Sequence, residues 1–94
     1  MNEMRIYKYV VKPESVNNEL FAYIEMPLGA KILTVQSQRD EVVIWAEIVD
    51  AVTIEKRRFA IRMTGQQFEH GFQDKYIGTF QMGPFVGHLY EVPL

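Results

Sequence analysis

Three cationic side chains at short spacings are the residues best suited to bind a ligand. Lys56, Arg58 and Arg62 all lie in the segment Lys56–Thr64, where they are interspersed with apolar residues. In an extended strand successive side chains alternate between faces, so these three would share one face while the apolar residues point to the core. Arginine pairs with oxyanions through two parallel N–H groups, and the stripe therefore predicts an anion site for a phosphate or an acidic partner. The alternative is a solvated face that protects an edge strand from aggregation.

A polar loop offers a second kind of site. The stretch Gly65–Asp74 contains Gln66, Gln67, Phe68 and Phe72 and shows no alternation of apolar and polar residues. Aromatic side chains in a loop can anchor a partner, or they can fold back as a lid on the core. Since binding residues concentrate on loops held by a rigid scaffold, we predict a partner-binding loop here.

Catalytic and metal-binding patterns are weak. His70 and His88 are the only histidines, and their spacing matches no metal-ligand motif. The sequence has no GxSxG elbow, no Walker-A loop and no GxGxxG turn. An acid–base pair could be built from Glu47, a charge inside an apolar strand, together with His88, Glu25 or Glu91. We therefore expect no catalytic site, no metal and no cofactor.

Composition narrows the function classes further. The 94 residues carry 10 basic and 12 acidic side chains, a net charge of −2, and no cysteine. Without cysteine there can be no disulfide scaffold, thiol catalysis or iron–sulfur cluster. The slightly acidic balance argues against a nucleic-acid-binding protein.

Targeting signals are not apparent in the sequence. The opening residues Met1–Arg5 are mostly polar and precede no apolar stretch of the signal-peptide type. No apolar run approaches the roughly 20 residues that a membrane-spanning helix needs. We expect a cytoplasmic protein without a membrane partner.

Short alternating segments separated by turn residues predict an all-β fold. We interpret residues 1–94 as a single domain, an antiparallel sandwich or barrel-like meander of six to seven short strands in up-and-down order. A helix would be at most one short piece in Glu14–Leu20 or Gln66–Asp74. The expected strands are Arg5–Val11, Leu20–Met26, Lys31–Gln38, Glu41–Val49, Lys56–Thr64, Lys75–Gln81 and Phe85–Val92.

Two of these segments carry specific predictions about burial. Glu41–Val49 is apolar on both faces, which is typical of the most buried, central strand. In Lys31–Gln38, we expect Leu33 and Val35 to face inward.

Four segments together resemble a known family. Ile6–Tyr9, Ile24–Gln36, Ile44–Ala46 and Tyr76–Gln81 occur in the order and spacing of a small family encoded mainly by bacteriophages and prophages. That family is described only as a domain of unknown function. The resemblance implies a phage accessory protein of the kind that disarms host defences or modulates host enzymes.

The sequence departs from the family pattern at two places. The family often has Thr-Gly-His after the fifth strand, whereas this chain has Gln66 in place of the histidine. The family often has a tryptophan before the final histidine, whereas this chain has Gly87 before His88. These departures weaken a catalytic role for the loop and a stacking role beside His88.

Three functions remain open at this point. The first is a non-enzymatic phage protein that binds and modulates a host protein, with defence proteins as candidate targets. The second is an oligomeric small-molecule binder that sequesters a nucleotide signal, with the basic stripe holding its phosphates. The third is a structural component of the virion. Exposed sheet edges would also allow a homodimer.

Overall fold

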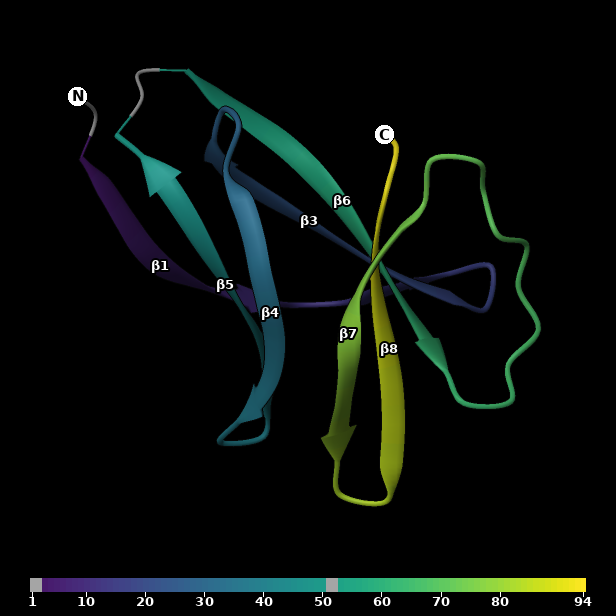
Figure 1. Ribbon diagram of the computed structural model, residues 1–94. Coiled ribbons are helices and arrows are strands. Elements are labelled where there is room, and N and C mark those ends of the chain that lie inside the picture. The colour runs from purple at the N-terminus through teal and green to yellow at the C-terminus, as the bar shows by residue number, and fades with distance from the viewer. Residues whose placement is uncertain (1–2, 51–52) are drawn as a thin grey trace.

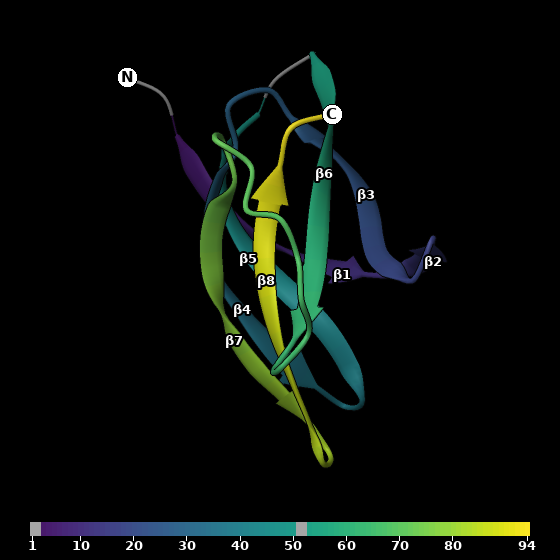
Figure 2. The ribbon, with the colours of Figure 1, turned by 90° about the vertical axis from the view of Figure 1, so that its right-hand side faces the viewer.

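The protein is a two-layer β-sandwich (Figures 1 and 2). The structure is a computed structural model and describes residues 3–50 and 53–94. Three strands form one antiparallel sheet in the order β1-β5-β4, and five form the other in the order β2-β3-β6-β8-β7. The strands are β1 (Met4–Val11), β2 (Glu14–Val16), β3 (Glu19–Pro27), β4 (Lys31–Gln38), β5 (Glu41–Val49), β6 (Ile54–Met63), β7 (Lys75–Met82) and β8 (Phe85–Val92).

The all-β prediction is confirmed, but the up-and-down strand order is wrong. Only β2–β3, β4–β5 and β7–β8 are hairpins, whereas β1 pairs with β5 and β3 pairs with β6. The tight turn Pro27–Ala30, closed by the Ala30 N–H on the Pro27 carbonyl at 3.1 Å, carries the chain from one sheet to the other. A short connection can thus join two layers as well as two paired strands, and length alone does not distinguish these cases.

Neither segment considered for a helix is helical. Glu14–Val16 forms β2, which pairs with the start of β3 through a turn at Asn17 and Asn18, both with positive φ. This Asn-Asn pair suits the tight hairpin turn that matches strand twist, and it was the missed signal for an additional strand. Gln66–Asp74 is irregular. Among residues 3–50 and 53–94, no helix is long and apolar enough to cross a membrane.

The core lies between the two sheets, and β5 is its centre as predicted. β5 is flanked by β1 and β4, and Ile44 and Ala46 are fully buried. Val35 of β4 also points inward, but the prediction for Leu33 is wrong, because the pairing of β4 with β5 shifts at this residue and leaves Leu33 40% exposed. The extra residue of such a bulge turns its side chain out of the alternating pattern. The buried cluster comprises Val11, Ala22, Ile24, Met26, Ala30, Val35, Val42, Ile44, Ala46, Ile48, Phe59, Ile61, Phe80 and Leu89.

A close contact between β7 and β8 explains the glycine found where the family often has tryptophan. Phe80 and Gly87 are directly paired across the two strands. A Cβ atom at Gly87 would lie 2.5 Å from the Phe80 ring, well inside van der Waals contact. The Phe80 ring therefore occupies the space that a side chain at position 87 would need.

Replacing Gly87 by alanine should destabilise the fold. We expect a loss of about 1–3 kcal/mol in the free energy of unfolding, because the added methyl group must push the buried Phe80 ring out of place. Urea denaturation of Gly87→Ala against the wild type measures this. Gln81→Ala, an exposed change in the same hairpin, is the control and should stay within about 0.5 kcal/mol of the wild type. Equal stability of Gly87→Ala and the wild type would contradict the close packing.

Candidate functional site

The candidate site lies on the outer face of the five-stranded sheet, under the connection between β6 and β7. Arg62 on β6 is paired with His88 on β8, and Ala60 with Tyr90, so these side chains share one face. The connection leaves β6 in a turn closed by the Gln66 N–H on the Met63 carbonyl at 3.0 Å. It then runs along the front of β8, where Figure 2 shows it as a thin green trace. The loop thus covers a face that would otherwise be open to solvent.

Arg62 holds this loop against the sheet. Its side chain is buried, and Nη2 donates to Oδ2 of Asp74 at 3.0 Å at the far end of the loop. The guanidinium carbon lies 4.1 Å from the centre of the Phe68 ring and 4.5 Å from that of Tyr90. The two rings also touch each other, with centroids 5.8 Å apart. A charged hydrogen bond and two cation–π contacts thus join loop to sheet through one side chain.

Asp74 is the acceptor on which this arrangement depends. Burial alone would raise the pKa of its carboxyl, but the hydrogen bond from the Gly71 N–H and the Arg62 guanidinium outweigh burial. The pKa of Asp74 is therefore lowered from its ordinary value. The carboxylate accepts the Gly71 N–H at 2.8 Å and so also shapes the end of the loop.

A chain of hydrogen bonds fixes His88 beside this cluster. Its Nε2 lies 2.8 Å from the hydroxyl of Thr64, and its Nδ1 lies 2.9 Å from the hydroxyl of Thr79. Thr79 in turn lies 2.5 Å from the hydroxyl of Tyr76. Each ring nitrogen thus has a hydroxyl partner, and the two contacts fix the orientation of the imidazole ring.

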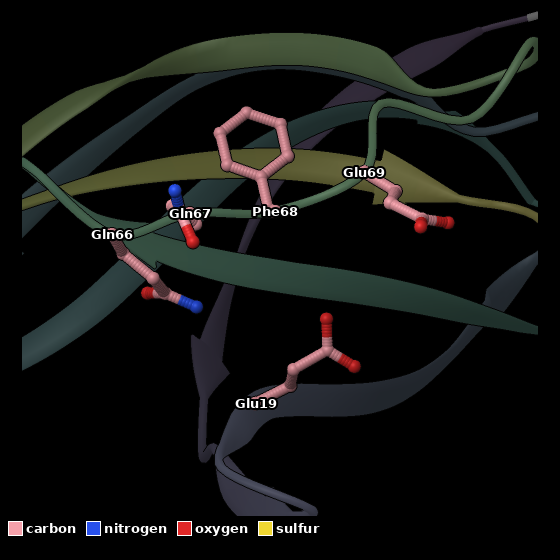
Figure 3. A pocket seen from close by; sticks show the side chains of 5 residues that line it. All are labelled: Glu19, Gln66, Gln67, Phe68 and Glu69. Carbon is pink, nitrogen blue, oxygen red and sulfur yellow. The ribbon is translucent and has the colours of Figure 1, made fainter.

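Two hollows open on either side of Phe68. The larger, about 630 Å³, is an open groove between the loop and the β2–β3 hairpin, lined by Glu19, Gln66, Gln67, Phe68 and Glu69. In Figure 3 Glu19 rises from β3 toward the loop residues Gln66 and Glu69. The smaller, about 280 Å³, lies between Arg62, Gln66, Phe68, His88 and Tyr90.

The structure does not bring the three predicted anion-binding residues together at a free surface. Lys56 is exposed, but Arg58 donates to the Pro93 carbonyl and lies over the Phe21 ring at 5.2 Å. Arg62 is buried under the loop. The alternative reading, a charged face that protects an edge, is wrong because β6 lies between β3 and β8.

The four predicted loop residues divide into two groups. Gln66, Gln67 and Phe68 line the larger groove, and Phe68 packs on the sheet as a lid. Phe72 is 97% exposed. Phe68 therefore folds back onto the outer face of the sheet and not onto the core, whereas the ring of Phe72 is left in solvent.

Sequence reasoning missed a second ion pair at the other end of β6. Arg57 Nε and Nη2 donate to the two carboxylate oxygens of Glu91 at 2.6 and 2.7 Å, and Nη1 donates to the Ala30 carbonyl at 2.5 Å. The hydrogen bonds to Glu91 raise the pKa of Arg57. This guanidinium joins β6, β8 and the turn between the sheets. An arginine on the apolar face of β6 was the only signal for it in the sequence.

The acid–base pair of His88 and Glu47 is not assembled. His88 lies on β8 of the five-stranded sheet, whereas Glu47 lies on β5 of the other sheet, between Ile6 and Lys31. Within the described part of the chain, no three metal-ligating side chains come together.

Comparison with known proteins identifies a family without a known activity. A model of a domain of unknown function, DUF7352, matches residues 2–94, and the chain belongs to this family. No curated protein and no solved structure matches the chain. The resemblance to a family of unknown function is thus confirmed, and the function must be argued from the site itself.

The lowered pKa of Asp74 predicts acid sensitivity. A carboxyl whose pKa is lower in the folded state stabilises the fold fully above its unfolded pKa, and this contribution is lost as pH falls through the folded pKa. We expect the wild type to lose this stability below about pH 5. At neutral pH Asp74→Asn should lower the free energy of unfolding by about 1–3 kcal/mol, since Arg62 then lacks its counter-charge. The stability of this variant should also fall less as the pH is lowered, because asparagine cannot be protonated in place of Asp74.

Urea denaturation across acidic pH tests this, and the chain offers a matched control. Asp50 is paired with Arg5 at 3.2 Å, but its side chain is 67% exposed. Asp50→Asn should therefore keep the pH dependence of the wild type. Identical pH profiles for Asp74→Asn and Asp50→Asn would show that Asp74 does not hold the loop.

Proposed function

We propose that this domain is a non-enzymatic, phage-encoded accessory protein that binds and modulates a protein of the infected bacterium. It would act in the cytoplasm of that host. The sequence resemblance supports the phage origin, and the shape of the loop between β6 and β7 supports protein binding. Among host proteins, those of defence systems are the partners that such a role suggests.

The observation that carries the proposal is Phe72. Its ring is 97% exposed on a loop that is held at both sides, by Phe68 against Tyr90 and by Asp74 on Arg62. An exposed aromatic ring on a braced support loses little conformational entropy on binding, which is the property of interface anchors. The neighbouring groove would give the partner a polar rim, with Gln67 and Glu69 as hydrogen-bonding groups.

The nucleotide-sequestering alternative draws less support from the same geometry. It relied on Lys56, Arg58 and Arg62 gripping phosphates together, but Arg58 and Arg62 are each engaged within the protein. Of this set only Lys56 is exposed to a polyphosphate, because Arg58 is half-buried and Arg62 is buried. Protein binding through the loop is therefore the function that we favour.

Replacing Phe72 by alanine should abolish partner binding without affecting the fold. Its ring is exposed, so the change should alter the free energy of unfolding by less than about 0.5 kcal/mol, whereas loss of an interface anchor weakens binding by about tenfold or more. Native mass spectrometry of protein gently purified from a bacterial lysate would show a co-purifying protein of defined stoichiometry with the wild type and not with Phe72→Ala.

Phe85→Ala is the matched control. Phe85 is also a phenylalanine with 62% exposure, but it sits at the turn between β7 and β8. Its variant should retain the partner. A partner that binds Phe72→Ala as well as the wild type would refute the role of the loop.

A further inference from the structure

One nitrogen of the Arg62 guanidinium is left without a hydrogen bond. Nη2 is engaged by Asp74, but Nη1 is shielded from solvent and has no acceptor among residues 3–50 and 53–94. The Arg62 side chain is only 9% exposed. Buried donors are nearly always paired in folded proteins, so a shielded, unpaired N–H group on a permanently charged side chain points to an acceptor that the chain itself does not supply.

The smaller hollow beside Phe68 is the place for that acceptor. It is lined by Arg62 and has a volume of about 280 Å³, which suits a compact group and not an extended ligand. Phe68 and Tyr90 form apolar walls, and His88 is held by its two threonine contacts. Phe68 is 39% exposed and belongs to the loop, so it is the wall that can move to admit a ligand.

Two of the polar side chains at the hollow, Gln66 and Arg62, have N–H groups available as donors. Gln66 uses its Oε1 to accept the Met63 N–H at 2.9 Å, which leaves its amide nitrogen as a donor. Arg62 offers the two N–H groups of Nη1 once Phe68 moves aside, because Nη1 is shielded from solvent in the structure. A site that offers donors and apolar walls suits a ligand group that only accepts hydrogen bonds, and the guanidinium adds the charge that favours an anion.

Asp74 limits which anion can bind. Its carboxylate already neutralises one side of the guanidinium at 3.0 Å and would repel a highly charged ligand. The fork of an arginine can hold one oxyanion at each side, provided the second is small and carries little charge. The Asp74 carboxylate would repel a polyphosphate strongly and a single phosphoryl or carboxylate group less.

We propose that the hollow between Arg62, Gln66, Phe68 and His88 binds one compact oxyanion, a phosphoryl or carboxylate group, through Arg62 Nη1 and the Gln66 amide. This site is separate from Phe72 and does not depend on the proposed protein partner. The oxyanion can be free or can belong to a larger molecule, such as a phosphorylated side chain or a nucleoside monophosphate.

Titration of ¹⁵N-labelled protein followed by NMR tests the site. The probes are orthophosphate, acetate, O-phosphoserine and a nucleoside monophosphate, which separate phosphoryl from carboxylate and free from esterified phosphate. We expect at least one probe to cause saturable shifts of the amide signals of Thr64, Gly65, Gln66 and His88. Absence of saturable shifts at these residues with all four probes would overturn the proposal.

Variants connect such shifts to the guanidinium. Arg62→Met/Asp74→Asn replaces the charge pair by neutral side chains and should abolish saturable binding. Gln66→Leu leaves the Arg62–Asp74 pair intact and should weaken binding by about tenfold, the effect of losing one hydrogen bond to a charged group. If the double variant does not fold, Gln66→Leu alone tests the site, and wild-type anion affinity in this variant would contradict the proposal.

Arg58→Met is the matched control for the loss of a positive charge. Arg58 lies on the same strand and has an unpaired buried Nε, but it does not line the hollow. Its variant should bind the anion with wild-type affinity, and so should Phe72→Ala. Equal loss in Arg58→Met and in the Arg62 double variant would show that the shifts report general charge attraction, and the proposal would fail.

Discussion

The enclosure of one guanidinium group organises the face of the protein that carries the candidate site. Arg62 lies on a central strand, yet its charge is covered by a loop and not by solvent. Burying an arginine is tolerated only when its charge is balanced by a nearby anion. Asp74 at the end of the loop neutralises the charge of the guanidinium, and the rings of Phe68 and Tyr90 cover its faces. The loop is therefore held where it is because the charge beneath it must be satisfied.

This constraint connects the scaffold to the surfaces that we propose to be functional. The same loop presents Phe72 outward, forms one wall of the groove near Glu19 and closes the hollow beside His88. A loop without the Arg62–Asp74 pair would have few contacts to fix it, and an exposed aromatic ring would then lose more entropy on binding. At the other end of β6, Arg57 joins the two sheets through Glu91 and the Ala30 carbonyl. One strand thus carries a half-buried arginine that joins the sheets at one end and a buried arginine at the candidate site at the other.

The class of the fold could be predicted from the sequence, but the pairing of its strands could not. Alternation identified seven of the eight strands, and the doubly apolar segment Glu41–Val49 identified the central one. The pairing of β1 with β5 could not be seen, because alternation describes each strand singly and does not reveal its neighbour. The outward turn of Leu33 likewise depends on a register shift, which exists only relative to β5. For the site, the loop and Arg62 were found, but Asp74 and Tyr90 were not, since their roles depend on meeting Arg62 in space.

By itself, the sequence determined an all-β domain of short strands, a polar loop with aromatic residues after the fifth predicted strand, and membership of a family of unknown function. These properties follow from local pattern, because the two-residue period of a strand and the turn preferences of glycine and asparagine act over a few residues. The sequence left a sandwich and a barrel-like meander open, and the pairing of the strands into two sheets decided for the sandwich. Only the tertiary structure decided which cations are exposed and which are buried, and which aromatic ring of the loop packs on the sheet and which is left in solvent. A charge is free or paired according to what lies opposite it, and here the partner comes from the end of a loop twelve positions further along the chain.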